Sequence, residues 1–208
     1  MLSSKSLYLS PLLKADLPIL FQWINDREQV LFNAPYRVVS ENDHREWYES
    51  IRKRKDVVLL GIRLRRGMKL IGSCQLHDIH VIHRTAFLQI RIGDVRQRGR
   101  GYGTEAVGLL LRHAFSDLNL NKVHVFVFAG NTAAIRMYEC SGFRKEGRLK
   151  QAAHIDGSYV DLLVMGIPKK RFSLTAVGPN AHAGTRSGRF RRAGTDEKTG
   201  TVKRGPRS

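Results

Sequence analysis

Hydrophobic residues follow two periodic patterns along the first 170 positions. Over residues 16–26 and 40–54 they recur every three to four positions, as on one face of a helix, and we predict a helix for each range. Ser40 and Asn42 favour the N-terminal cap of the second helix. A short hydrophobic strand at 7–9 precedes both helices.

Hydrophobic and polar residues alternate in the middle of the chain, which is typical of strands with one buried face. The alternation predicts strands at 57–64, 69–79 and 85–93. Arg66-Gly67 supplies a turn between the first two. Such short connections favour antiparallel neighbours.

The C-terminal part of the domain mixes both periods. In chain order it predicts a helix at 103–118, a strand at 122–128, a helix at 131–141, and strands at 143–150 and 158–167. Gly142 is a fitting C-cap, and Asp156-Gly157 is a hairpin turn signal. The elements together predict an α+β (mixed α/β) fold, in which two βα units interrupt an otherwise antiparallel meander.

The composition changes near residue 170. Residues 171–208 are rich in Gly, Ser, Thr, Ala and Arg, and cannot bury enough apolar surface to offset the entropy of ordering. We predict a folded domain over 1–170 and a basic, disordered C-terminal tail over 171–208. The chain carries a net charge of +18, which favours anionic partners such as phosphorylated coenzymes or nucleic acid. We expect the tail to be solvated rather than bound to nucleic acid.

Cysteine usage and hydropathy narrow the class of protein. No hydrophobic run approaches the roughly 18 residues of a membrane span. The first residues lack the apolar centre of a secretory signal, so a cytoplasmic protein is expected. Cys74 and Cys140 are far apart and form no CxxC pair. We expect both to pack as reduced, small apolar side chains, and we expect no metal site.

The segment 96–106 carries the strongest chemical signal. It lies between a predicted strand and a predicted helix, and it reads Arg-Gln-Arg-Gly-Arg-Gly-Tyr-Gly-Thr-Glu-Ala. Glycines let successive main-chain N–H groups turn toward one anion, and the helix N-terminus and the arginines add positive charge. The segment therefore predicts a phosphate or pyrophosphate site. It matches neither the dinucleotide fingerprint nor the P-loop pattern.

This loop resembles one in a known family. Arg98-x-x-Gly101-x-Gly103 is similar to the (Gln/Arg)-x-x-Gly-x-(Gly/Ala) loop with which GNAT acetyltransferases hold the pyrophosphate of coenzyme A. Arg96-x-x-Gly99-x-Gly101 also fits the pattern. We prefer the later register, because Gly103 and the residues after it then begin the helix as they do in the family.

A second segment, 131–143, resembles the family's Asn-x-x-Ala-Ile-x-x-Tyr-x-x-x-Gly-Phe. The resemblance extends over about 7–167. It implies that Asn131 contacts the pantetheine or adjoining part of acetyl-CoA, and that Tyr138 protonates the departing CoA thiolate. Taken without the resemblance, Asn131 reads equally well as a helix N-cap and Tyr138 as a core aromatic residue.

The resemblance also implies an architecture and a set of coenzyme contacts. The architecture is a GNAT-type, mostly antiparallel sheet with a splayed parallel strand pair and helices on both faces. A main-chain N–H in the splayed strand would stabilise the oxyanion. The coenzyme contacts implied are Ile90, Arg91, Ile92, Arg98, Gly99, Arg100, Gly101, Tyr102, Gly103, Thr104 and Asn131.

Two segments, 23–26 and 40–47, are similar to the substrate side of one branch, the ribosomal-protein-alanine and nucleotide-amino-sugar N-acetyltransferases. The function implied is acetyl transfer from acetyl-CoA to a primary amine of a small molecule, such as a nucleotide-linked amino sugar, by a monomer or homodimer. Two alternatives stay open. One is N-terminal acetylation of a ribosomal protein, and the other is a non-catalytic, basic nucleic-acid-binding module.

The general base is not evident from the sequence. Many members of the branch carry an Ala-Glu pair near the start of the strand before the pyrophosphate loop, and here that pair reads Ala86-Phe87. A water relay would serve instead of a side chain. The side-chain candidates are His77, Asp78, His80 and His83.

Overall fold

The computed structural model describes residues 2–31 and 34–172, whose strands form one eight-stranded sheet in the order β1-β2-β3-β4-β5-β6-β8-β7. The strands are β1 (Leu2–Ser3), β2 (Leu7–Pro11), β3 (Val58–Leu64), β4 (Leu70–His80), β5 (Thr85–Ile92), β6 (Lys122–Phe128), β7 (Arg144–Ile155) and β8 (Ser158–Pro168). Among these described strands, β5 and β6 are the parallel pair and the other neighbours are antiparallel. The mixed α/β prediction, with its splayed parallel pair, is confirmed.

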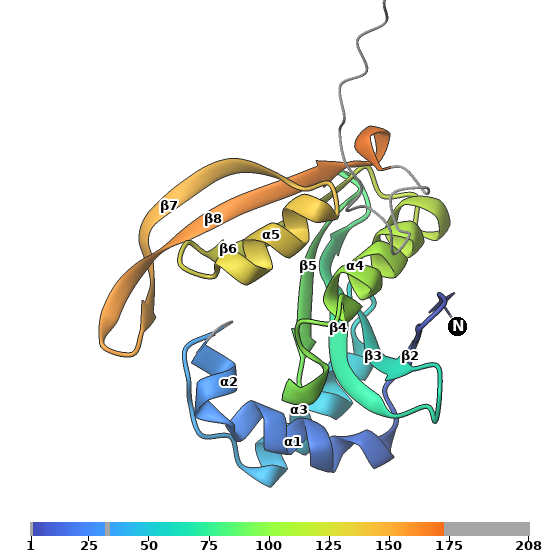
Figure 1. Ribbon diagram of the computed structural model, residues 1–208, viewed down its shortest axis with the longest axis vertical. Coiled ribbons are helices and arrows are strands. Elements are labelled where there is room, and N and C mark those ends of the chain that lie inside the picture. The colour runs from blue at the N-terminus through green and yellow to red at the C-terminus, as the bar shows by residue number, and fades with distance from the viewer. Residues whose placement is uncertain (1, 32–33, 173–208) are drawn as a thin grey trace, which may run out of the picture.

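Helices cover both faces of this sheet (Figure 1). The helices are α1 (Leu17–Asn25), α2 (Arg27–Leu31), α3 (Glu41–Lys53), α4 (Tyr102–Arg112) and α5 (Thr132–Cys140). Helices α4 and α5 lie on one side, whereas α1 and α3 lie on the other, below the β3–β5 part of the sheet (Figure 1). The long β7–β8 hairpin curves away from α5 toward α2 (Figure 1).

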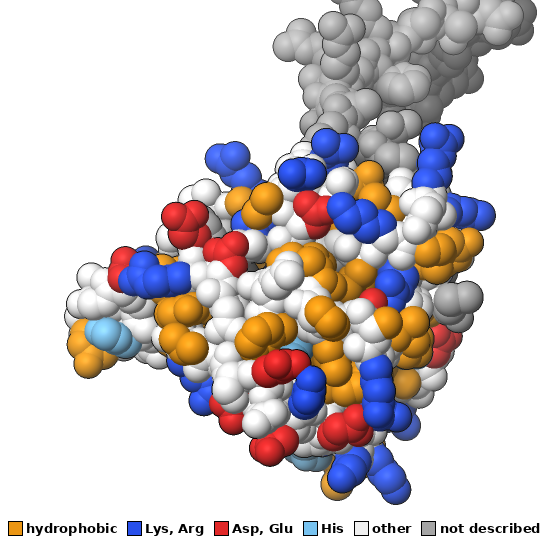
Figure 2. Space-filling model, turned by 90° about the horizontal axis from the view of Figure 1, so that it is seen from below, with side chains coloured by type: hydrophobic (Ala, Val, Ile, Leu, Met, Phe, Trp, Pro, Cys, Tyr) orange, Lys and Arg blue, Asp and Glu red, His pale blue; other side chains and the backbone are white. Residues whose placement is uncertain are grey.

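Basic and acidic side chains share the surface. On the face seen from below, Lys and Arg side chains are interspersed with Asp and Glu around hydrophobic ones (Figure 2). The excess of positive charge therefore forms no continuous basic surface on that face of the described residues. Within the same residues, no helix is both long and apolar enough to cross a membrane.

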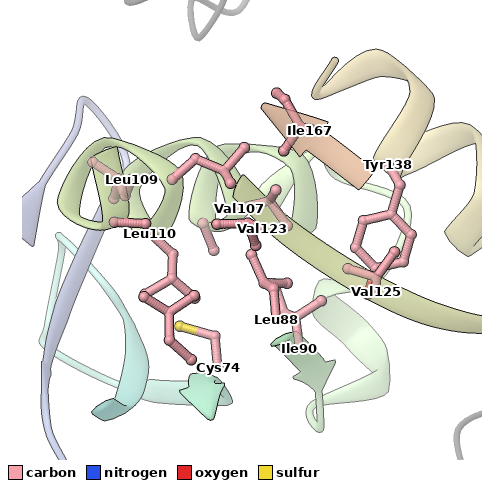
Figure 3. Close-up of a cluster of buried hydrophobic side chains, with 14 of the residues drawn as sticks. Cys74, Leu88, Ile90, Val107, Leu109, Leu110, Val123, Val125, Tyr138 and Ile167 are labelled. Atoms are coloured by element: carbon pink, nitrogen blue, oxygen red, sulfur yellow. The ribbon is translucent and has the colours of Figure 1, made fainter. Parts of the chain in front are cut away.

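The main core lies between the sheet and α4 with α5 (Figure 3). Alternate residues of each central strand point into it, as the period of two requires. Each large apolar side chain buried here contributes roughly 1.5–3 kcal/mol. Cys74 belongs to this core, as expected, but Cys140 is exposed at the end of α5, so its predicted packing is wrong.

A smaller core joins α1 and α3 to the opposite face. It contains Leu20, Trp23 and Tyr48. The Tyr48 hydroxyl donates to the Leu12 carbonyl oxygen at 3.0 Å, which satisfies its one buried polar group. This core fixes the position of α1 and α3 beneath the centre of the sheet.

Most predicted helices and strands are found, with four differences. The two-residue strand β1 was not predicted. The predicted helix 103–118 is α-helical only to Arg112 and continues as a π turn over His113–Asp117. The predicted strand 143–150 extends to Ile155 in β7. The short helix α2 was not predicted. The predicted tail lies outside the described residues from position 173 onward.

Candidate active site

The parallel strands β5 and β6 separate after a short stretch of pairing. Their register runs from Thr85 opposite Lys122 to Phe87 opposite His124. Both strands continue beyond this point, to Ile92 and Phe128. A gap therefore opens between the carboxyl-terminal halves of two neighbouring strands.

Main-chain groups of β5 face this gap. The Gly93 N–H donates to the Ile71 carbonyl oxygen of β4 at 2.9 Å. Hydrogen-bonded and non-bonded pairs alternate along an antiparallel ladder. Arg91 therefore shares its main-chain hydrogen bonds with β4, whereas the main chains of Ile90 and Ile92 point toward the gap.

The glycine-rich loop ends at the N-terminus of α4, beside the gap. Gly99 and Gly101 have φ values of 71° and 81°, a region that residues with a Cβ avoid. Gly101 is the N-cap of α4 and supplies no side-chain cap. The N–H groups of the first helical turn, over 102–104, therefore have no intrahelical acceptor and carry the positive end of the helix dipole. The later register of the motif ends inside this first turn.

The exposed Arg98 side chain supports the loop through two hydrogen bonds to other parts of the protein. Its Nε donates to the Ile92 carbonyl oxygen at 2.9 Å, and its Nη2 donates to Oε1 of Gln29 at 2.8 Å. Its guanidinium therefore ties the loop to the end of β5 and to α2. These bonds give Arg98 a role in holding the loop, and its contact with the coenzyme stays a prediction.

Helix α5 carries the other two residues of the family signature. Oδ1 of Asn131 accepts from the Ala134 N–H at 3.0 Å, so Asn131 is the N-cap of α5. The Tyr138 ring extends from α5 beside Val125 of β6 (Figure 3) and meets Phe143 edge to face at 5.4 Å. Both non-catalytic interpretations of these residues are thus compatible with the structure.

The Tyr138 hydroxyl remains open to a ligand. Burial of the ring raises the pKa of Tyr138, so its hydroxyl stays protonated at neutral pH. Among the described residues this hydroxyl has no hydrogen-bond partner, while every fully enclosed polar side-chain atom has one. The Tyr138 oxygen therefore keeps contact with solvent despite the buried ring.

A cavity of about 370 Å³ lies on the opposite face of the sheet, between α1, α3 and strands β3–β5. Its wall includes Gln89, Ile90 and Arg91 of β5, which border the gap on their other side. The segments 23–26 and 40–47, singled out by resemblance, both contribute to it. Its aromatic and polar lining consists of Trp23, Arg37, Asp43, His44, Trp47, Ser73, Gln75, Gln89 and Arg91.

Two ionisable groups in this cavity have shifted pKa values. Burial lowers the pKa of His44, which is 6 % exposed, and so favours the neutral imidazole. Burial, and to a smaller extent the charge of Arg98, lowers the pKa of Arg91. Arg91 nevertheless keeps its charge, since guanidinium is not deprotonated in proteins.

The candidate bases from the sequence lie elsewhere. The described residues that line the cavity do not include His77, Asp78, His80 or His83. Nδ1 of His77 lies 2.9 Å from a carboxylate oxygen of Asp78, and the rings of His80 and His83 stack at 4.2 Å. The described residues contain no group of three or more His, Cys, Asp or Glu that could hold a metal ion.

The chain is similar in sequence to known acetyltransferases. Residues 6–144 match the model of the acetyltransferase (GNAT) domain. The chain is 36% identical over 103 residues to spermidine N(1)-acetyltransferase of Vibrio cholerae, covering 50% of this chain and 59% of that relative. It is 28% identical over 103 residues to the putative ribosomal N-acetyltransferase YdaF of Bacillus subtilis, covering 50% of this chain and 56% of that relative. The chain thus matches little more than half the length of these relatives.

Solved structures agree over a longer span. The crystal structure of spermidine N-acetyltransferase from Vibrio cholerae in complex with CoA and spermine superposes with a TM-score of 0.75 and 29% identity. The match covers 81% of this chain and 98% of that chain. These relatives support the family expected from the sequence, but not specifically its ribosomal-protein-alanine and amino-sugar branch. The chain belongs to the GNAT family of acetyl-CoA-dependent N-acetyltransferases.

Proposed function

We propose that this protein transfers an acetyl group from acetyl-CoA to the primary amine of a small molecule. One observation carries the proposal: the gap between β5 and β6 and the cavity beneath α1 and α3 share the wall formed by Gln89, Ile90 and Arg91. A thioester in the gap and an amine in the cavity would meet across this wall. Holding two reactants together supplies much of the rate of such a transfer.

The coenzyme would lie along the gap and the glycine-rich loop. The N–H groups of residues 99–104 would bind the pyrophosphate, helped by the dipole of α4 and the charge of Arg100. Arg98 would position this loop through Ile92 and Gln29. Asn131 would orient the start of α5 beside the pantetheine.

The main chain of β5 and Tyr138 would perform the acyl chemistry. A main-chain N–H of Ile90 or Ile92 would donate to the thioester oxygen as negative charge develops there. Tyr138 would then give its proton to the departing thiolate. Its raised pKa keeps the proton available, and the hydroxyl breaks no hydrogen bond to the residues that the structure describes.

The charges of the cavity favour an acceptor that carries an anionic group as well as an amine. Among its described lining residues, Arg37 and Arg91 are cationic and Asp43 is the carboxylate. Asp43 also accepts from the Ser40 N–H at 3.4 Å in the cap of α3. A nucleotide-linked amino sugar offers both groups, with its pyrophosphate near the arginines and its amine beside the aromatic wall.

Spermidine is the second candidate acceptor, because the chain is similar to spermidine N-acetyltransferases both in sequence and in structure. A polyamine binds best among carboxylates, and two arginines would repel it. Acetylation of a ribosomal protein is supported by the similarity to YdaF. The interspersed charges in Figure 2 give less support to a nucleic-acid-binding module.

Release of free CoA thiol tests the proposal. Purified full-length protein and acetyl-CoA would be incubated with nucleotide amino sugars, spermidine, an alanine-terminated peptide or an aminoglycoside. We expect fastest turnover with a nucleotide amino sugar, and loss of that preference in Arg37→Gln. If spermidine were turned over faster than the nucleotide amino sugars, the acceptor would be a polyamine and not an anionic molecule. If the protein bound no acetyl-CoA but bound RNA in a salt-sensitive manner, the proposal that it is an enzyme would be wrong.

A further inference from the structure

The wall of the acceptor cavity contains one buried imidazole. His44 lies in the first turn of α3, where its main-chain N–H donates to the Ser40 carbonyl oxygen at 3.0 Å. Its ring contacts two aromatic rings, with Trp47 stacked at 5.3 Å and Phe21 tilted at 5.7 Å. The aromatic contacts hold the imidazole in one orientation against the cavity.

The ring nitrogens of His44 remain available to a ligand. No hydrogen bond joins them to another of the described residues, although every fully enclosed polar side-chain atom there has a partner. An unpaired nitrogen of His44 must therefore be accessible, and His44 lines the cavity. A neutral imidazole in this position presents a lone pair to the bound amine.

We propose that His44 is the general base that takes a proton from the acceptor amine. The inference rests on the proposed function and adds a catalytic residue to it. Phe87 of β5 cannot accept a proton, and His44 supplies such a group from another element. His77, His80 and His83 do not line the cavity and would not reach the amine.

The proton and electron balance of the step is complete. His44 takes one proton from the ammonium group, and the freed nitrogen lone pair forms a bond to the thioester carbonyl carbon. The carbon–sulfur bond breaks, and the CoA thiolate takes its proton from Tyr138. The second amine proton is lost as the amide forms and restores Tyr138 through solvent. The net products are the acetamide, CoA thiol and the proton on His44, which passes to water.

The surroundings of His44 keep it neutral in the working range of pH. The ionisable groups that share its cavity are Asp43 of α3, Arg37 before α3, Arg91 of β5 and Cys74 of β4. Burial raises the pKa of Cys74 to about 12, so that thiol is uncharged. The α1 side presents only apolar residues to the cavity. Burial therefore places the pKa of His44 below its ordinary value of 6.5.

The test compares His44→Gln with His83→Gln, an exposed histidine of the β4–β5 turn. We expect His44→Gln to lower kcat/KM at pH 7 by roughly 10²- to 10³-fold with unchanged acetyl-CoA binding, and His83→Gln to behave like the wild type. The wild-type kcat/KM should be level above the pKa of His44 and fall below it. In His44→Gln it should instead rise tenfold per pH unit until the free amine is deprotonated.

Chemical rescue separates proton transfer from a structural role. The variant His44→Ala opens a space for imidazole, and added imidazole should restore turnover in proportion to its neutral form. A wild-type pH profile retained in His44→Gln, or no rescue of a folded His44→Ala that still binds acetyl-CoA, would overturn the assignment of His44 alone. A wild-type protein that turns over no amine would overturn the proposed function and, with it, this inference.

Discussion

The indole ring of Trp23 fills the space that a side chain on Gly93 would need. A Cβ built on Gly93 would lie 2.0 Å from Cδ2 of Trp23. Gly93 follows the last residue of β5, and Trp23 forms part of the acceptor cavity. The missing side chain therefore lets α1 lie directly against the end of the strand that borders both the gap and the cavity.

Gly93→Ala should disturb both stability and acceptor binding. The added methyl group would force Trp23 out of its place, because the contact involves the rigid indole ring. We expect the free energy of unfolding to fall by about 1–3 kcal/mol, as for other overpacked sites, and the KM for the acceptor to rise. Urea unfolding and steady-state kinetics measure the two effects. Gly147→Ala is the matched control, since a Cβ there meets nothing within 4 Å. Equal stability of the two variants would contradict the contact.

Replacing Arg98 should weaken coenzyme binding. Arg98→Gln loses the hydrogen bonds to Ile92 and Gln29, so the loop is held less firmly beneath the pyrophosphate. At this exposed position we expect the Kd for acetyl-CoA to rise roughly 5- to 10-fold, corresponding to about 1 kcal/mol. Isothermal titration measures it. Arg96→Gln carries the same charge change in the other register of the motif, and an equal loss there would assign the effect to charge alone.

Tyr138→Phe should slow turnover while leaving the fold intact. The phenyl ring keeps the contact with Phe143, and the lost hydroxyl has no hydrogen-bond partner among the described residues. We expect kcat to fall by roughly 10²-fold or more, with the Kd for acetyl-CoA changed less than about twofold. Tyr159→Phe, at an exposed tyrosine of β8, serves as the control. Full turnover by Tyr138→Phe would remove Tyr138 from the mechanism.

The two cysteines should differ strongly in reactivity. Burial raises the pKa of Cys74 to about 12, so at pH 8 only about 10⁻⁴ of this thiol is ionised, and the core also blocks access. Cys140 is exposed. A disulfide reagent should therefore label one thiol quickly in the native protein and a second only in urea. Cys140→Ser should abolish the fast phase, and a fast phase that survives this substitution would contradict the burial of Cys74.

Local patterns predicted the elements that have one clearly buried face. In β6 the buried residues Val123, Val125 and Val127 alternate with more exposed ones, and the predicted range 122–128 matches the structure. The end of α4 was placed too late because the π turn at His113–Asp117 keeps a helical hydrophobic pattern while changing its hydrogen bonds. Helix α2, with five residues, is too short to show a period.

The two parts of the candidate site differ in how far they can be predicted from local sequence patterns. The glycine-rich loop is a continuous segment, so residues 98–104 could be predicted as a coenzyme site from the sequence alone, and that prediction stays open. The acceptor cavity is assembled from α1, α3 and one face of β3–β5, and no local pattern encodes that assembly. His44 lay within a segment already identified by resemblance, but only burial distinguishes it from the exposed histidines 80 and 83.

One ion pair of helix α2 joins it to a segment that is synthesised late. Arg27 at the start of α2 pairs with Asp156 in the β7–β8 turn, 129 positions further along the chain. The residues lining the acceptor cavity have all been synthesised by position 91. The ion pair between Arg27 and Asp156 cannot form until the β7–β8 hairpin has emerged from the ribosomal exit tunnel. A nascent chain therefore contains all of its described cavity-lining residues long before this ion pair can be made.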